Sequence, residues 1–280
     1  MRKVCGVPTA GKWIEWCNEA RERTSVLKEA AERGEPRPAI NADFYKKPRA
    51  ELLGHFSEKC AYCEQYITAG CKQGDIDHFR PKSGVTNADG SRVLLPSGHP
   101  HEGYWWLAYD PQNLLPSCIG CNRYGSDLEG RKSGKWDRFP TVEDFHARVP
   151  SEIDKEVPLL INPWIDEPNE HLVFNSPFGI VGSRTARGRA TIDILDLNRE
   201  KLMERRRDLI ISMHLWFGEA AHLYRAGDHF KLRRLLLTFA SYRAGTKELS
   251  AFAVAQLERE KASLSEFFNT VSLILSNSST

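Results

Sequence analysis

The chain has 280 residues, 41% of them hydrophobic, and a formal net charge of +2 at pH 7. This composition is too apolar for an intrinsically disordered chain, and it supplies enough large side chains for a sizeable core. The near balance of charge carries no bulk signature of a nucleic-acid binder, so any basic surface has to be local.

The distribution of apolar residues disfavours a membrane-spanning protein and a secreted protein. Stretches such as 209–217, "LIISMHLWF", are far shorter than a membrane span. The first residues, "MRKVCGVPTAGKW", lack the apolar core of a signal peptide. We therefore expect a cytoplasmic protein.

The N-terminal part of the chain predicts helices. Residues 11–34 carry a rough apolar stripe, made by Ile14, Cys17, Ala20 and Val26–Leu27, and Gly34 ends it. After a proline-containing loop, residues 49–59, "RAELLGHFSEK", predict a short helix that leads to Cys60.

From Cys60 to about Pro140 short hydrophobic pieces alternate with Gly, Pro and Asn, which is typical of a backbone fixed by a metal. Within it, residues 124–136, "YGSDLEGRKSGKW", predict a glycine-punctuated loop. Residues 157–183 then suggest short strands and turns. From Thr191 onward apolar residues recur at helical spacing, in three successive patterns that end near Leu275.

We therefore predict an α+β protein in which a small metal-stapled unit is embedded among helices from both ends of the chain. The predicted parts are an N-terminal helical region (1–54), the metal-stapled unit (55–142), a region of short strands and loops (143–190) and a C-terminal helical region (191–280).

Four of the seven cysteines form two C-x-x-C pairs, Cys60 with Cys63 and Cys118 with Cys121. Each pair can present two thiolates to one ion, and two such turns complete a tetrahedral site. In a reducing compartment this pattern favours a metal over disulfides, and Zn²⁺ suits an all-sulfur site without redox chemistry. Such a closed site is structural. The alternative is four reduced, buried cysteines.

An acid and a histidine, Asp77 and His78, lie between the two cysteine pairs in "GDIDHFRPKSG", and "DPQNLLPSCIGCN" follows near the second pair. Together these motifs resemble the HNH endonuclease family. The resemblance implies a ββα-metal unit whose matching residues are Asp77, His78, Asn113 and Asn122. Taken singly, these residues could equally be a surface ion pair, a turn residue and a helix cap.

More narrowly, "KCAYCE", "DHFRPK", "YWWLAYDPQNLLPSC", "RFP", "LLINPWIDEPNEHLVF" and "ATIDILDLNREKL" look like the HNH proteins of Septu anti-phage systems and of certain retrons. The similarity spans roughly Lys47 to Arg207. It implies a role in defence and a partner ATPase of the ABC-like class.

The chemistry of phosphodiester hydrolysis explains these residue types. His78 can serve as the general base that takes a proton from water. Asp77 and Asn122 offer oxygen ligands to one Mg²⁺ or Mn²⁺, and Asn113 is expected to tie down the intervening loop and orient His78. Because neighbours on a strand point to opposite sides, the strand has to bend where Asp77 and His78 meet one phosphate.

Contacts to nucleic acid are expected from cations near this site: Arg80, Lys82, Arg123 and Lys135. Trp105 and Trp106 could stack on bases or belong to the core.

Two other functions remain open at this point. One is a zinc-stapled binding module without catalysis, and the other is a ribonuclease that cuts tRNA or another structured RNA. DNA is favoured as the substrate on grounds of the family resemblance alone.

Overall fold

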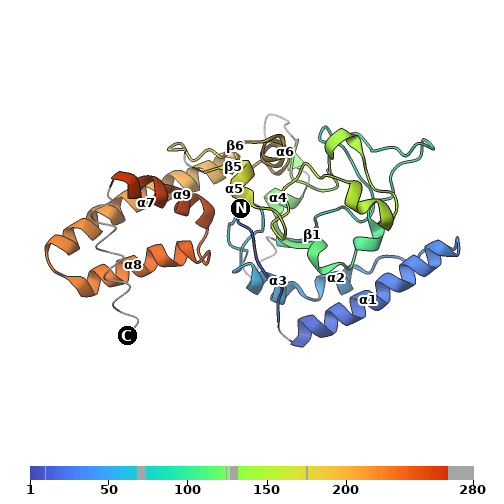
Figure 1. The fold of residues 1–280 in the computed structure, drawn as a ribbon, viewed down its shortest axis with the longest axis horizontal. Coiled ribbons are helices and arrows are strands. Elements are labelled where there is room, and N and C mark those ends of the chain that lie inside the picture. Colours follow the sequence, from blue (N-terminus) through green and yellow to red (C-terminus); the bar gives the residue numbers. More distant parts are fainter. Residues whose placement is uncertain (10, 68–73, 124, 127–131, 175, 264–280) are drawn as a thin grey trace.

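Two parts of the molecule separate along its long axis (Figure 1). This computed structural model describes residues 1–9, 11–67, 74–123, 125–126, 132–174 and 176–263. A globular part contains the N-terminal helices and all the described strands, and an arm of three helices extends from it (Figure 1). The mixture of helices with small sheets agrees with the predicted α+β class.

The described helices begin and end as follows: α1 (Gly11–Glu32), α2 (Ala42–Lys46), α3 (Arg49–His55), α4 (Ile119–Asn122), α5 (Pro168–His171), α6 (Ala186–Leu195), α7 (Glu200–Arg225), α8 (His229–Arg243) and α9 (Ser250–Ser263). The described strands pair in antiparallel twos: β1 (Gly74–His78) with β2 (Leu114–Cys118), β3 (Gly125–Ser126) with β4 (Lys132–Ser133), and β5 (Leu172–Val173) with β6 (Gly182–Ser183).

Helix α1 occupies the predicted range, and its buried face agrees with the predicted stripe only in part, at Ala20 and Leu27. Ile14 and Val26 are 53% and 52% exposed, whereas Trp13 and Trp16 are buried. The Trp16 ring stacks on Phe44 of α2, and its indole N–H donates to the carbonyl of Phe44 at 3.0 Å. Each indole has a large apolar surface, so burying both favours the helix face that carries them.

The sheet of β1 and β2 lies at the centre of the globular part. Its register places Asp77 opposite Leu115 and His78 opposite Leu114, and both leucines are fully buried. The one-turn helix α4 follows β2 directly and contacts both strands. The chain therefore forms two strands and a short helix in sequence order, with residues 79–113 inserted between the strands.

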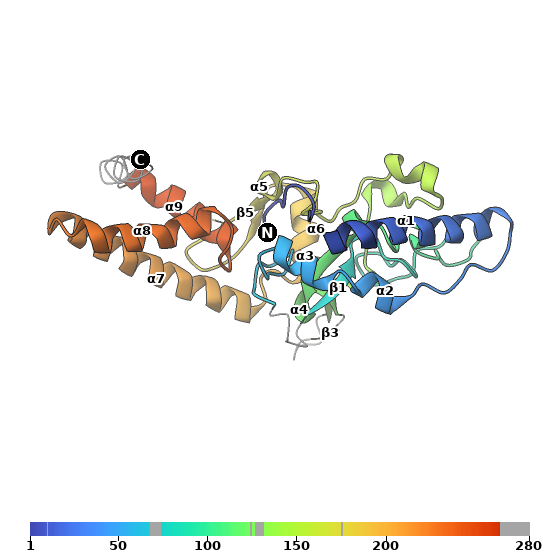
Figure 2. The same cartoon turned by 90° about the horizontal axis from the view of Figure 1, so that it is seen from below.

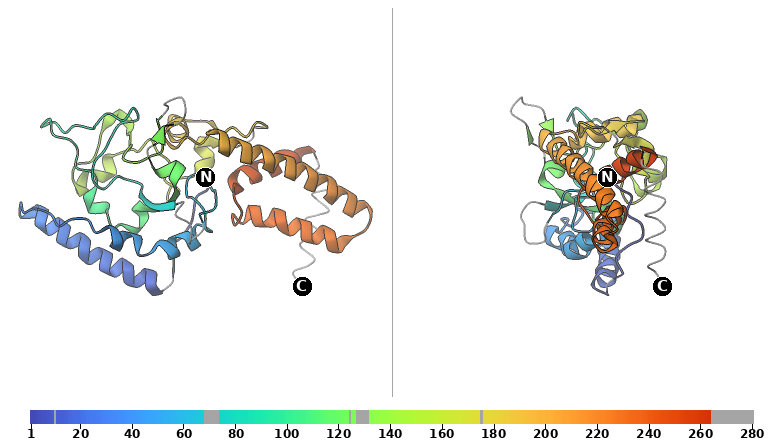
Figure 3. Two further views of the ribbon diagram at one scale, coloured as in Figure 1. Left: turned by 180° about the vertical axis from the view of Figure 1, so that it is seen from behind. Right: turned by 90° about the vertical axis from the view of Figure 1, so that its left-hand side faces the viewer.

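The arm is built by α7, α8 and α9. Helices α7 and α8 run antiparallel, and the turn between them lies at the far tip (Figures 2 and 3). The predicted helical pattern of α7 is confirmed, because every residue of its predicted stripe is buried: Leu202, Leu209, Met213, Phe217, Ala220 and Leu223. The last predicted pattern, to Leu275, is described as helix to Ser263, and its remainder lies outside the described residues.

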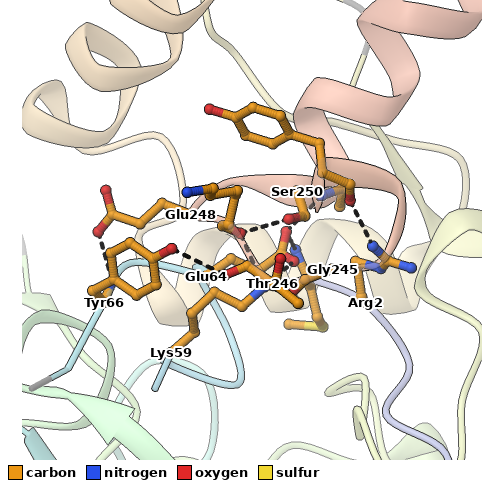
Figure 4. Close-up of polar contacts among 12 residues, drawn as sticks. Arg2, Lys59, Glu64, Tyr66, Gly245, Thr246, Glu248 and Ser250 are labelled. Atoms are coloured by element: carbon orange, nitrogen blue, oxygen red, sulfur yellow. Dashed lines mark hydrogen bonds and ion pairs between the residues drawn. The ribbon is translucent and has the colours of Figure 1, made fainter. Parts of the chain in front are cut away.

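The linker between α8 and α9 fixes the arm to the cysteine-containing loop of residues 59–66 (Figure 4). The Lys59 ammonium donates to the carbonyl of Lys247 at 3.1 Å, and the Tyr66 hydroxyl donates to that of Thr246 at 2.9 Å. Glu64, which is buried, accepts from the first turn of α9 through the Ala251 N–H at 2.9 Å. Polar contacts to main-chain groups therefore hold this junction.

Across the described ranges of the chain, each helix is too short or too polar to cross a membrane.

Candidate active site and metal centre

Strand β2 brings the two cysteine pairs together. The N–H of Ala61, inside the first pair, donates to the carbonyl of Pro116 on β2 at 2.8 Å. Within that first turn, the Cys60 carbonyl accepts from the N–H of Glu64 at 3.0 Å. The second pair lies at the end of β2 and in α4, so sequence-distant turns face each other.

The four predicted cysteines form one cluster, in which all sulfur atoms lie within 4.8 Å of one another. The Cys63 and Cys118 sulfurs are 3.6 Å apart, too far for a disulfide. Four thiolates at about 2.3 Å from a tetrahedral Zn²⁺ would be about 3.8 Å apart. The cluster can therefore hold a metal ion such as zinc.

Arg199, which precedes α7, covers this cluster. Its guanidinium nitrogens lie 3.6 Å from the sulfurs of Cys63 and Cys121 and 3.7 Å from that of Cys118. Burial acts to raise the pKa of the Cys63 thiol, but hydrogen bonds from the neighbouring thiols and the charge of Arg199 hold that pKa well below its ordinary value. Arg199 thus favours the thiolate form that binds metal. Sequence reasoning did not find this residue.

Asp77 and His78 end strand β1 and line one cavity of about 730 Å³. Both residues line this cavity although neighbours on a strand ordinarily point to opposite faces. Asn122, the last residue of α4, lines it too. Three of the four residues predicted for catalysis therefore share one cavity.

The imidazole of His78 is buried and held in one tautomer. Its Nε2 lies 2.9 Å from the carbonyl of Ala108, which can only accept, so Nε2 carries the hydrogen and Nδ1 keeps a lone pair. Burial, helped by the charge of Lys82, lowers the pKa of His78 to about 3. The ring is therefore neutral at physiological pH.

Two side-chain donors hold the buried carboxylate of Asp77. The Tyr62 hydroxyl donates to Oδ2 at 2.6 Å, and the Lys135 ammonium donates to Oδ1 at 3.2 Å. Burial raises the pKa of Asp77, and the attraction of Lys135 opposes that rise. Tyr62 lies between the cysteines of the first pair, so the metal cluster and the acid are connected through one side chain.

Asn113 is buried, is not among the residues that line the cavity, and binds backbone. Its amide oxygen accepts from the N–H of Arg80 at 2.7 Å, and its nitrogen donates to the carbonyls of Arg80 and Leu107 at 3.1 and 3.0 Å. Leu107 immediately precedes Ala108, which holds His78. Asn113 therefore ties Arg80 to Leu107 through their backbones, and the described contacts include no direct side-chain hydrogen bond between Asn113 and His78.

The four cations predicted to contact nucleic acid lie in different environments. Lys82 and Arg123 line the cavity. The Arg80 guanidinium instead donates to the buried carboxylate of Glu156 at 2.8 Å. Lys135 corrects the sequence-based prediction, because its side chain is fully buried against Asp77 and has no surface with which to meet a phosphate.

The aromatic residues also differ from expectation. Trp106 is buried, which supports the core alternative, and Trp105 is partly buried with the Arg37 guanidinium 4.4 Å from its ring. The tryptophan that lines the cavity is Trp136, which is 59% exposed. Its sequence signal was an aromatic residue at the end of the predicted polar, glycine-containing loop, of which residues 124 and 127–131 lie outside the described structure.

Comparison with known proteins finds relatives over about half the chain, whereas no protein-family model matches it. The chain is 37% identical over 154 residues to Septu protein PtuB of Bacillus mycoides (strain KBAB4), covering 54% of this chain and 46% of that protein. It is 33% identical over 154 residues to Septu protein PtuA of the same strain, covering 54% and 19%. Septu protein PtuB of Bacillus thuringiensis is 28% identical over 149 residues, covering 53% and 40%.

The chain thus spans less than half the length of each of these curated relatives. The resemblance predicted from its motifs is nevertheless confirmed: over about half of its own length, this chain is similar to Septu proteins.

Proposed function

We propose that this protein is a divalent-metal-dependent endonuclease of the HNH type, which hydrolyses phosphodiester bonds in nucleic acid, with DNA favoured. The observation that carries the proposal is the meeting of Asp77, His78 and Asn122 in one cavity beside a four-cysteine cluster. These are three of the four side chains that the family resemblance assigns to catalysis.

His78 is the general base of the proposed reaction. Its Nδ1 carries a lone pair because Nε2 donates to Ala108, and the ring is neutral at physiological pH. A positioned neutral imidazole can take the proton of an attacking water, and it does so best when its pKa lies near the working pH. The proposal therefore requires the negative charge of the bound phosphate to raise the pKa of His78 above about 3. The Ala108 carbonyl then stabilises the imidazolium that forms, as the buried acceptor on the opposite nitrogen.

Asp77 and Asn122 would hold the catalytic Mg²⁺ or Mn²⁺. The Tyr62 hydroxyl and the Lys135 ammonium each donate to a different oxygen of Asp77, and a carboxylate offers about four acceptor positions in all, so it can also bind a cation. A carboxylate with an amide oxygen fits a hard cation that keeps several water or phosphate ligands. When bound, such an ion stabilises the charge that develops on the phosphate and the leaving oxygen.

Lys82 and Arg123 are the cations that we assign to the phosphates beside the scissile one, since both line the cavity. In-line attack by water would leave a 5′-phosphate and a 3′-hydroxyl. The cysteine cluster would hold Zn²⁺ with a structural role only, within a nuclease unit of residues 55–142.

The biological setting that we propose is anti-phage defence together with an ATPase partner. Similarity to both PtuA and PtuB supports a place in the Septu group. The arm of α7–α9 is our candidate for the surface that meets the partner, because exposed large apolar residues lie on it: Ile211, Leu215, Phe230 and Leu237.

The test is to incubate the purified chain, with and without the product of the neighbouring gene, with plasmid DNA, single-stranded DNA and total RNA in Mg²⁺ or Mn²⁺. The proposal predicts cleavage of DNA that requires the divalent ion and produces 5′-phosphate ends. Degradation of RNA alone would establish the ribonuclease alternative. Binding without cleavage under every condition would establish the binding module.

A further inference from the structure

Trp136 is placed where neither packing nor backbone preference explains it. Its side chain is 59% exposed, although an indole is among the most costly apolar groups to leave in water. It lines the cavity that also contains Asp77 and His78. Its two neighbours in the chain are less exposed than Trp136: Lys135 is fully buried and Asp137 is partly buried.

The backbone holds this tryptophan in a conformation that ordinary residues avoid. Its φ is +50°, in the left-handed region that favours glycine and costs other residues about 1 kcal/mol or more. Main-chain contacts hold it there: the Trp136 N–H donates to the carbonyl of Asn122 at 2.7 Å, and the Lys135 N–H donates to that of Cys121 at 2.7 Å. The fold therefore keeps Trp136 next to Asn122 at a cost in stability.

The groups around Trp136 are those that recognise a nucleic-acid strand. Lys82 and Lys46 lie 5.1 and 5.8 Å from the ring of Tyr45, which lines the same cavity. Arg123 lines it as well and pairs at the surface with Asp75. Cations that follow a phosphate backbone, beside an aromatic side chain on which a base can stack, are the usual combination in proteins that bind single strands.

We propose that Trp136 stacks on an unpaired nucleobase next to the scissile phosphate, so that the substrate is single-stranded or locally unpaired nucleic acid. This inference rests on the proposed nuclease function and specifies its substrate class. In a duplex both faces of a base are covered by its neighbours, so the indole can reach a face only where the strand is unpaired or a base is turned out.

The experiment measures binding of fluorescein-labelled oligonucleotides by anisotropy, with His78→Ala in every variant so that no strand is cut. We expect Trp136→Ala to weaken binding of the single strand about tenfold, the loss of one base–aromatic stack, and to leave duplex binding nearly unchanged. Trp136→Phe should recover most of the affinity because it restores a ring. Phe178→Ala, which removes a 66% exposed aromatic side chain from the loop between β5 and β6, is the matched control and should change neither affinity.

A second arm replaces single nucleotides of the strand, one at a time, by an abasic residue. An abasic residue at the stacking position should weaken binding to the protein that has Trp136. The same replacement should not weaken binding to the Trp136→Ala variant any further. Zinc content and thermal melting of each variant establish that the fold is intact.

The outcomes separate the two proposals. If wild type cleaves nucleic acid but Trp136→Ala binds single strands as tightly as its parent, or loses single-strand and duplex binding equally, the stacking role is wrong and the nuclease proposal stands. If the parent protein binds no nucleic acid at all, both are wrong.

Discussion

Lys135 and Asp77 form a buried ion pair: the lysine ammonium lies 3.2 Å from Oδ1 of the acid, and neither side chain is more than 5% exposed. The same ammonium donates to the carbonyl of His78 at 2.6 Å. One cation from the segment after α4 thereby fixes the end of β1, where the proposed metal ligand and general base are adjacent. The pair explains how a loop residue can control the geometry of the site without touching substrate.

Replacement of Lys135 by Met should destabilise the protein by about 3–5 kcal/mol, because Asp77 is left as a buried charge without its partner. Urea unfolding measures this free energy. Adding Asp77→Asn to the Lys135→Met variant should restore part of the lost free energy of unfolding, because it removes the buried charge. Lys12→Met, at an exposed position of α1, is the control and should change stability by less than about 0.5 kcal/mol. Equal stability of the Lys135 and Lys12 variants would show that the ion pair is not present in solution.

Asn113→Asp should lower both stability and the proposed nuclease activity. The carboxylate can still accept from the Arg80 N–H, but it cannot donate to the carbonyls of Arg80 and Leu107. Two lost donors at a buried site should cost about 2–4 kcal/mol in unfolding free energy. Asn18→Ala, on the exposed face of α1, should leave stability almost unchanged. An Asn113→Asp variant that unfolds at the wild-type urea concentration would contradict this account of residues 80 and 107–108.

Cys60→Ser and Cys121→Ser should each lower zinc content and melting temperature, since the fold around β2 depends on the cluster. Metal analysis and calorimetry on the same samples measure both. Cys5→Ser is the matched control, because Cys5 is exposed and outside the cluster. The zinc proposal would be refuted by cluster variants that melt as the Cys5 variant does and by a wild-type protein that contains no zinc.

Arg199→Met should weaken zinc affinity about 10- to 100-fold, as expected for loss of a group that contacts the ligands. The zinc affinity of Arg199→Lys should lie between those of wild type and Arg199→Met, because lysine keeps the charge but cannot reach three sulfurs with one planar group. Competition with a chromophoric chelator gives the affinity without any assay of activity. Arg205→Met, which removes an exposed arginine paired with Glu248, should release zinc as wild type does. Identical zinc affinity in the two methionine variants would remove Arg199 from this role.

The elements best predicted from sequence were those set by short-range spacing. The C-x-x-C pairs identified all four members of the cysteine cluster, and the helical repeat of α7 identified its buried face. The predicted stripe of α1 is right at Ala20 and Leu27 but omits Trp13 and Trp16. Trp16 packs against Phe44, a contact that no periodicity within the helix contains.

Long-range contacts and an unusual backbone conformation explain what sequence missed. Arg199 reaches sulfurs of residues up to 136 positions away in the chain. Lys135 and Trp136 read alike as members of a polar loop, yet the turn at φ +50° sends one side chain to Asp77 and leaves the other exposed. Opposite environments for two adjacent residues follow from tertiary structure, which a single sequence does not display.

The most direct measurement is the rate at which zinc-loaded wild type and His78→Ala cleave DNA in Mg²⁺ or Mn²⁺, under the conditions in which wild type is active. The account predicts that His78→Ala keeps its zinc and its melting temperature but loses activity about 100- to 10,000-fold, the contribution of a general base. His99→Ala, which alters an exposed histidine elsewhere, should cleave at the wild-type rate. Cleavage by His78→Ala as fast as by the His99 variant would contradict the assignment of the active site.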